Sequence, residues 1–156
     1  RFAPEDHDAR MDALLWQGSY EAASRHVVRV SPAYRLMAQA RLALLQGSTP
    51  SQAGVPVPTG AMTDAGYVYN LTRHYRNSGQ PYEAVNLLST RAAFVSPAFD
   101  GTQFVSEALA VAKSAGATQA ASISGRRDAV FAPAPDIADG PSTCPLYTSY
   151  PAHASP

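Results

Sequence analysis

The chain has 156 residues, enough for one domain with a hydrophobic core, and its twelve basic and twelve acidic residues give a formal net charge of zero. This balance argues against a nucleic-acid partner, no apolar run approaches the roughly 20 residues that cross a bilayer, and the single cysteine, Cys144, excludes an internal disulfide. Residues 22–91 nevertheless hold seven arginines against two acids. Such a basic segment can attract a polyanion, although a solvated helix face has the same composition.

The first 47 residues predict three helices. A proline and several acidic residues open the first helix at Pro4, and an apolar stripe carries it to Gly18. Ser19 is a candidate N-cap for a second helix. Ser31 and the proline after it start a third helix, which ends near Gly47.

Residues 47–60 are rich in glycine and proline and predict a loop. Beyond the loop we expect a fourth helix over about 62–77 and a fifth over about 82–91. A sixth helix follows the break at residues 96–101, and a short seventh spans about 118–124.

A short pattern that surrounds a glycine occurs three times, at residues 15–23, 77–85 and 114–121. In the first two copies Tyr-Glu-Ala follows the glycine, and the third copy is rich in alanine. Glycine can adopt the left-handed backbone angle that closes a helix, and small residues after it let the next helix pack closely. Repeated helical hairpins of this kind are typical of an α-solenoid.

The chain therefore divides into a helical domain, residues 1–127, and a proline-rich tail, residues 128–156. Six prolines lie within residues 133–156, and no segment of the chain alternates with the two-residue period of strands. We expect an all-α fold: a superhelix, or solenoid, of about seven antiparallel helices in tetratricopeptide-like hairpins, followed by an irregular tail.

Several stretches carry a resemblance to a known family. Residues 12–25, which include Leu-Leu-Trp-Gln-Gly-Ser-Tyr-Glu-Ala-Ala, and residues 30–44 resemble the helical superdomain of soluble lytic transglycosylases. These bacterial periplasmic enzymes cleave the glycan strands of peptidoglycan. Residues 67–84 are similar to the next hairpin of that superdomain, and residues 128–137 with 147–149 are similar to the stretch that links its later helices.

The resemblance implies a function without catalysis. In the family, a lysozyme-like domain after the solenoid holds a catalytic glutamic acid near a Gly-Leu-Met-Gln motif, and this sequence contains no such motif. The chain is then the non-catalytic helical domain of the enzyme, or a fragment of it. The resemblance further implies a periplasmic protein that positions or binds peptidoglycan. We also expect a monomer that does not insert into a membrane.

The glutamates and histidines, which could serve in catalysis or metal binding, can also be explained by structural roles. Glu21 and Glu83 stand in the first turns of repeated helices, where a negative charge interacts favourably with the helix dipole, and we expect this role in place of catalysis. The four histidines show no metal-ligand spacing, so neither a metal nor a cofactor is expected. His26 is expected to be a half-buried packing residue.

A binding surface is predicted from arginines and tyrosines that share helix faces. Arginine grips carboxylates with a planar fork, peptidoglycan stem peptides are rich in carboxylates, and tyrosine rings can stack on sugars. The candidates for glycan or partner binding are Arg25, Arg29, Tyr69, Arg73, Tyr75 and Arg76. The alternative is that these arginines pair with neighbouring helices or solvate the surface.

Two other functions fit the same sequence. A protein-binding adaptor of the tetratricopeptide type would hold a partner's peptide in a concave groove. An enzyme with an unrecognised site would turn over glycan by itself.

Overall fold

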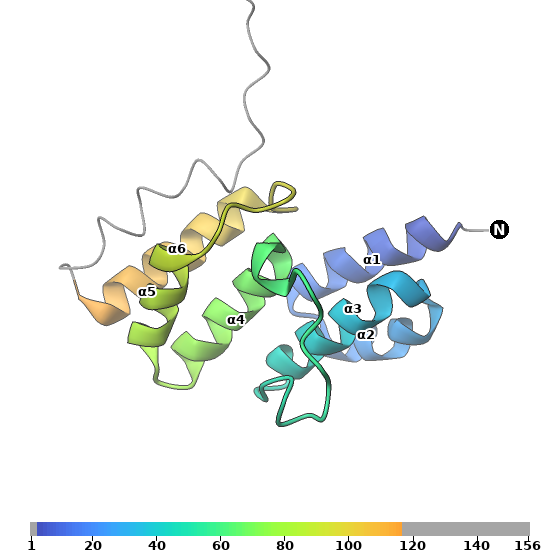
Figure 1. The fold of residues 1–156 in the computed structure, drawn as a ribbon, viewed down its shortest axis with the longest axis horizontal. Coiled ribbons are helices and arrows are strands. Elements are labelled where there is room, and N and C mark those ends of the chain that lie inside the picture. The colour runs from blue at the N-terminus through green and yellow to red at the C-terminus, as the bar shows by residue number, and fades with distance from the viewer. Residues whose placement is uncertain (1–2, 117–156) are drawn as a thin grey trace, which may run out of the picture.

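Every regular element of the described chain is helical, which confirms the all-α class. The computed structural model describes residues 3–116, and this part contains six α-helices, two 3-10 helices and no strand (Figure 1). In chain order the elements are α1 Pro4–Gln17, α2 Tyr20–His26, η1 Val27–Arg29, α3 Pro32–Leu45, η2 Ala61–Thr63, α4 Ala65–Asn77, α5 Pro81–Thr90 and α6 Gly101–Ala115. None of the helices in this part is long and apolar enough to cross a membrane.

Side-chain caps start three of these helices. Ser31, Asp64 and Asp100 each accept the backbone N–H of the residue three positions on, at 3.2, 2.6 and 2.8 Å. Asp64 also explains why the predicted helix 62–77 is divided, because its extended backbone separates η2 from α4. The predicted cap at Ser19 is wrong in its chemistry, since α2 starts after this residue but its side chain makes no capping bond.

Glycine closes three helices in the same way. Gly18, Gly47 and Gly79 have φ angles of 73, 87 and 76° and donate to the carbonyl three residues back. The residue after each glycine donates to the carbonyl five residues back, which completes a Schellman motif. The expected third copy at Gly116 does not close α6 in this way, because its ψ angle of 164° lies outside the left-handed helical region. The predicted helix 118–124 and tail 128–156 lie outside the described residues.

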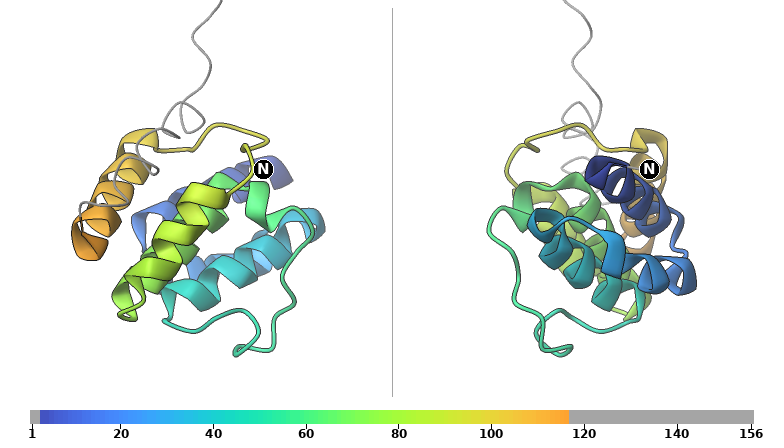
Figure 2. Two further views of the ribbon diagram at one scale, coloured as in Figure 1. Left: turned by 60° about the vertical axis from the view of Figure 1, so that its left-hand side comes forward. Right: turned by 90° about the vertical axis from the view of Figure 1, so that its right-hand side faces the viewer.

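The helices pack in chain order (Figure 2). Neighbours α1 and α2, α3 and α4, α4 and α5, and α5 and α6 are in contact, and α1 also packs on α3 as α4 does on α6. Trp16 links α1 to α4, because its ring stacks on Tyr69 of α4 with the two ring centroids 4.5 Å apart. One apolar cluster surrounds this pair and a smaller one lies among α1, α2 and α3.

A buried arginine, Arg41 of α3, links its own helix to both α1 and α4. The Arg41 guanidinium donates from Nε to Asn70 Oδ1 at 2.7 Å and from Nη1 to the Asp12 carboxylate and, at 2.9 Å, to the Tyr34 hydroxyl. Burial raises the pKa of the Tyr34 phenol, so the hydroxyl keeps its proton. The guanidinium lies against Gly66, where any side chain would occupy the same space.

Candidate functional site

The six predicted binding residues fall into two groups. Arg25 and Arg29 lie on α2 and η1, whereas the other four lie on α4. Figure 1 shows α2 and α4 in different parts of the helical array. The structure therefore divides the predicted surface into two.

Much of the α4 group is engaged in packing. Tyr69 is 2% exposed, and its hydroxyl accepts a hydrogen bond from Gln103 at 2.9 Å, so its ring offers no open face to a sugar. Arg76 donates from Nε and Nη2 to the two carboxylate oxygens of Glu107 at 2.5 and 3.1 Å. This bond to Glu107 raises the pKa of Arg76 and ties α4 to α6. Arg76 therefore pairs with a neighbouring helix, which was the alternative to ligand binding for this residue.

The other two α4 residues are half-buried. Tyr75 packs against the larger apolar cluster, and Arg73 lies near the Tyr69 hydroxyl, at 3.4 Å from its Nη1. They keep part of their surface exposed, so they remain candidates for contact with a ligand.

The α2 and η1 group lines a concave surface. Two adjoining cavities of about 280 and 470 Å³ share Arg10, His26 and Arg29 in their walls. Arg25 lines the first cavity and His7 the second. We call this surface the basic groove and define it by Arg10, Arg25, Arg29, His7 and His26.

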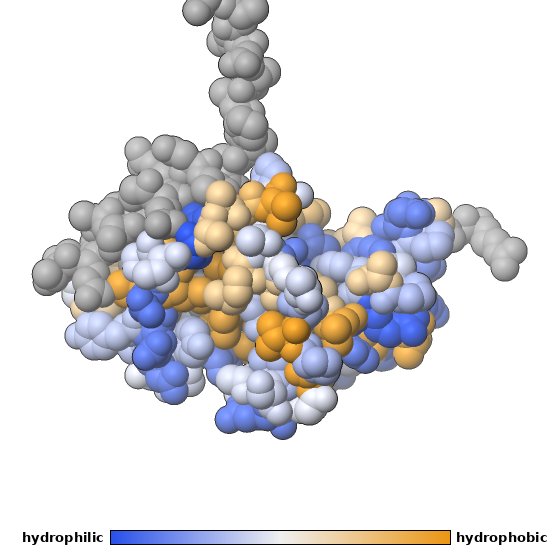
Figure 3. All heavy atoms as spheres, in the orientation of Figure 1, coloured by the Kyte–Doolittle hydropathy of each residue, from blue (hydrophilic) through white to orange (hydrophobic). Residues whose placement is uncertain are grey.

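Arg10 is the member of the basic groove that the sequence did not reveal. It belongs to α1, fifteen and nineteen positions before Arg25 and Arg29, and it reaches the same cavity only because α1 and α2 pack side by side. In Figure 3, hydrophilic residues dominate the side of the molecule formed by α1 and α3, whereas apolar residues collect nearer its middle.

His26 forms the floor of the basic groove. Its side chain is buried, and its Nε2 donates to the His7 carbonyl at 3.1 Å, with the two rings 5.3 Å apart. Burial lowers the pKa of His26; the hydrogen bond opposes this change, and the charges of His7, Arg10 and Arg29 add to it. The imidazole is therefore neutral at pH 7.

The lowered pKa of His26 predicts that acid destabilises the fold. A neutral buried imidazole contributes stability above the ordinary histidine pKa of about 6.5, and the contribution is lost as the pH falls through that value toward the lower pKa of the folded state. Urea unfolding from pH 7.5 to 5 should show decreasing stability, and His26→Gln should flatten this dependence. His74, whose pKa is also lowered by burial, keeps part of the slope. An unchanged slope in His26→Gln would contradict the assignment.

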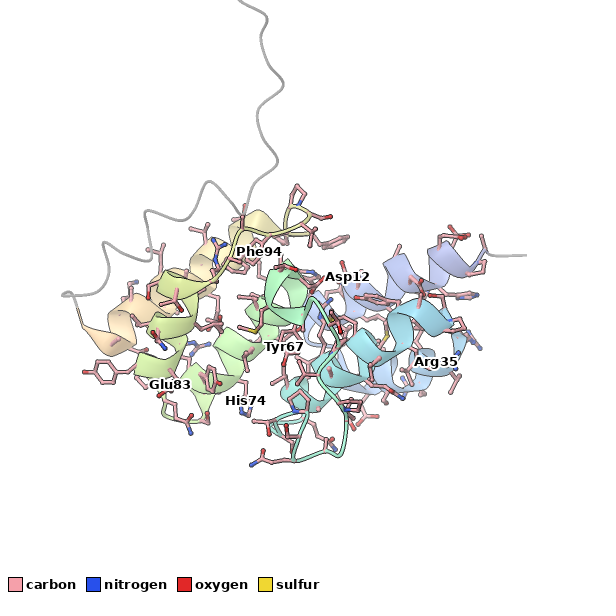
Figure 4. The ribbon with its side chains drawn as sticks, viewed as in Figure 1. Asp12, Arg35, Tyr67, His74, Glu83 and Phe94 are labelled. Carbon is pink, nitrogen blue, oxygen red and sulfur yellow. The ribbon has the colours of Figure 1, made fainter. Side chains whose placement is uncertain are left out.

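A third cavity lies on another side of α1 and is acidic. It has a volume of about 290 Å³, and its walls include Asp8, Asp12 and Asp64 (Figure 4 labels Asp12). All three carboxylates are engaged: Asp8 with Ser31 at 2.6 Å, Asp12 with the buried arginine, and Asp64 in its helix cap. In residues 3–116 no group of acids, histidines or cysteines has the arrangement of a metal site.

The two repeated glutamates occupy the positions expected for helix capping. Glu21 and Glu83 lie in the first turns of α2 and α5, and both are exposed. Glu21 also faces Arg25 at 3.7 Å.

Comparison of the chain with protein-family models, with curated proteins and with solved structures finds no match.

Proposed function

We propose that the chain is the non-catalytic helical part of a peptidoglycan lytic transglycosylase, which binds or positions glycan strands during cell-wall turnover. The observation that carries the proposal is the repeated hairpin. In α1–α2 and α4–α5, Tyr-Glu-Ala follows a glycine, Gly18 or Gly79, that closes the preceding helix with the same pair of hydrogen bonds. This repetition supports a solenoid of hairpins, the architecture that the sequence resemblance implies.

The basic groove supplies a surface suited to the peptidoglycan stem peptides. Their carboxylates match the planar fork of arginine, and Arg10, Arg25 and Arg29 line one concave region. Arg73 and Tyr75, both half-buried, offer further partly exposed surface on α4. In this proposal the chain works in the periplasm and leaves cleavage of the glycan to another domain.

Co-sedimentation with purified sacculi tests the proposal. We expect the full chain to pellet with sacculi in a saturable way, to stay in solution with cellulose, and to be released by soluble peptidoglycan fragments. A chain that stays in the supernatant at every concentration of sacculi would contradict the proposal.

A tetratricopeptide-like adaptor is the second candidate, and the segment between α5 and α6 favours it. Val95 and Phe99 are 81% and 64% exposed and border the acidic cavity, so they present apolar surface beside carboxylates. Such a surface suits a peptide that carries both apolar and basic side chains. Binding of a defined peptide partner, together with no binding to sacculi, would support this function over the first.

A further inference from the structure

Three structural elements bring arginines to the basic groove. Arg10 comes from α1, Arg25 from α2 and Arg29 from η1. The two cavities that they line share three residues and so form one concave surface. Arg10, His26 and Arg29 line both cavities, so the two arginines share one surface above the buried His26 imidazole.

The positive charge of the groove is poorly compensated. Within the described part of the chain, the guanidinium groups of Arg10 and Arg29 form neither a hydrogen bond nor an ion pair, and Arg25 faces only Glu21, at 3.7 Å with both side chains more than 70% exposed. A pair as exposed as this contributes little to stability. Asp6 also lines the groove and brings one negative charge against the three positive charges of the arginines; its carboxylate accepts the Ala3 N–H at 2.8 Å.

Other arginines of the fold are engaged with the protein. Arg35 donates to the Val30 carbonyl at 2.9 Å, while Arg41 and Arg76 bind carboxylates. The guanidinium groups of Arg10 and Arg29 differ from these in making no bond to the described protein, so all of their donors can serve a ligand that accepts hydrogen bonds.

We propose that the basic groove binds an oxyanion ligand with two or more negative charges, a polycarboxylate or a phosphate compound. A guanidinium group binds a carboxylate or phosphate through two parallel hydrogen bonds. Arginines on different elements can bind separate oxyanion groups of one ligand, so the groove favours a multiply charged ligand over a monovalent one. His26, fixed by its bond to the His7 carbonyl, gives these groups a rigid floor. This binding does not depend on the proposed cell-wall function.

Isothermal titration calorimetry tests the proposal. The full chain is titrated in turn with citrate, pyrophosphate and acetate, all at the same ionic strength. We expect saturable binding of citrate, pyrophosphate or both, and none of acetate. Preference for citrate assigns a carboxylate ligand, and preference for pyrophosphate assigns a phosphate ligand. Binding of acetate as tight as that of the polyvalent anions, or no binding of either polyvalent anion, would overturn the proposal.

The variant Arg10→Gln/Arg29→Gln locates the binding. Both side chains are exposed, so the fold should survive, which circular dichroism checks. Affinity should fall by roughly tenfold or more, because each lost charged hydrogen bond weakens binding. The matched control Arg35→Gln, an exposed arginine on α3, should keep the affinity (Figure 4). Equal affinity in the double variant and the wild type would overturn the assignment, whatever the sacculi experiment shows.

Discussion

Replacing Asp12 by alanine is expected to lower the free energy of unfolding by about 3–5 kcal/mol, because it leaves a buried cation without its carboxylate. The Arg41 side chain is 1% exposed and the Asp12 side chain 28% exposed. The remaining partners, Tyr34 and Asn70, are neutral and cannot replace the lost charge. Urea unfolding followed by circular dichroism measures the effect.

The partner variant Arg41→Met should cost less, about 1–3 kcal/mol. Methionine keeps most of the apolar stem, and the Asp12 carboxylate left behind can reach water. Glu21→Ala, which removes an exposed carboxylate that faces Arg25, is the matched control and should change stability by less than about 1 kcal/mol. A smaller loss for Asp12→Ala than for Arg41→Met would contradict the assignment of Arg41 as a buried charge.

Gly66→Ala is expected to destabilise the protein by about 2 kcal/mol, although ordinary helix propensity predicts a gain of about 1 kcal/mol. A Cβ at residue 66 would lie 2.5 Å from Cζ and 2.6 Å from Nη2 of Arg41. The guanidinium cannot move aside without breaking its bonds to Asp12 and Asn70. The sign of the change therefore tests the packing of α3 on α4.

The background Arg41→Met provides the control for this prediction. Methionine is flexible and has no guanidinium, so Gly66→Ala should cost much less there than in the wild type. Thermal or urea unfolding of the wild type, the two single variants and the double variant gives the coupling free energy between residues 41 and 66. Stabilisation of the wild-type protein by Gly66→Ala would contradict the geometry.

Local signals predicted most of the helix boundaries. Pro4 acts through its own fixed φ angle, whereas the cap at Ser31 and the glycines at 18, 47 and 79 act through bonds to residues nearby in the chain. The sequence therefore reveals all of them. Gly116 shows the limit of this reasoning, because a glycine at a helix end need not take the left-handed helical angles.

Long-range packing explains what the sequence did not reveal. Arg41 is buried because Asp12 and Asn70, each 29 positions away, meet it between helices, and no local pattern distinguishes it from a solvated arginine. Tyr69 was a candidate for sugar stacking, but Trp16 stacks on it in the core. Arg10 joins the basic groove only through the packing of α1 on α2.

The most direct test of the central claim is to incubate the full chain with sacculi, pellet them, and analyse the soluble fraction by mass spectrometry. A non-catalytic wall-binding domain predicts protein in the pellet and no new sugar products in solution. Release of anhydro-sugar fragments would show that the chain cleaves glycan itself. Protein that stays in solution with no products would contradict binding to the wall and favour the adaptor.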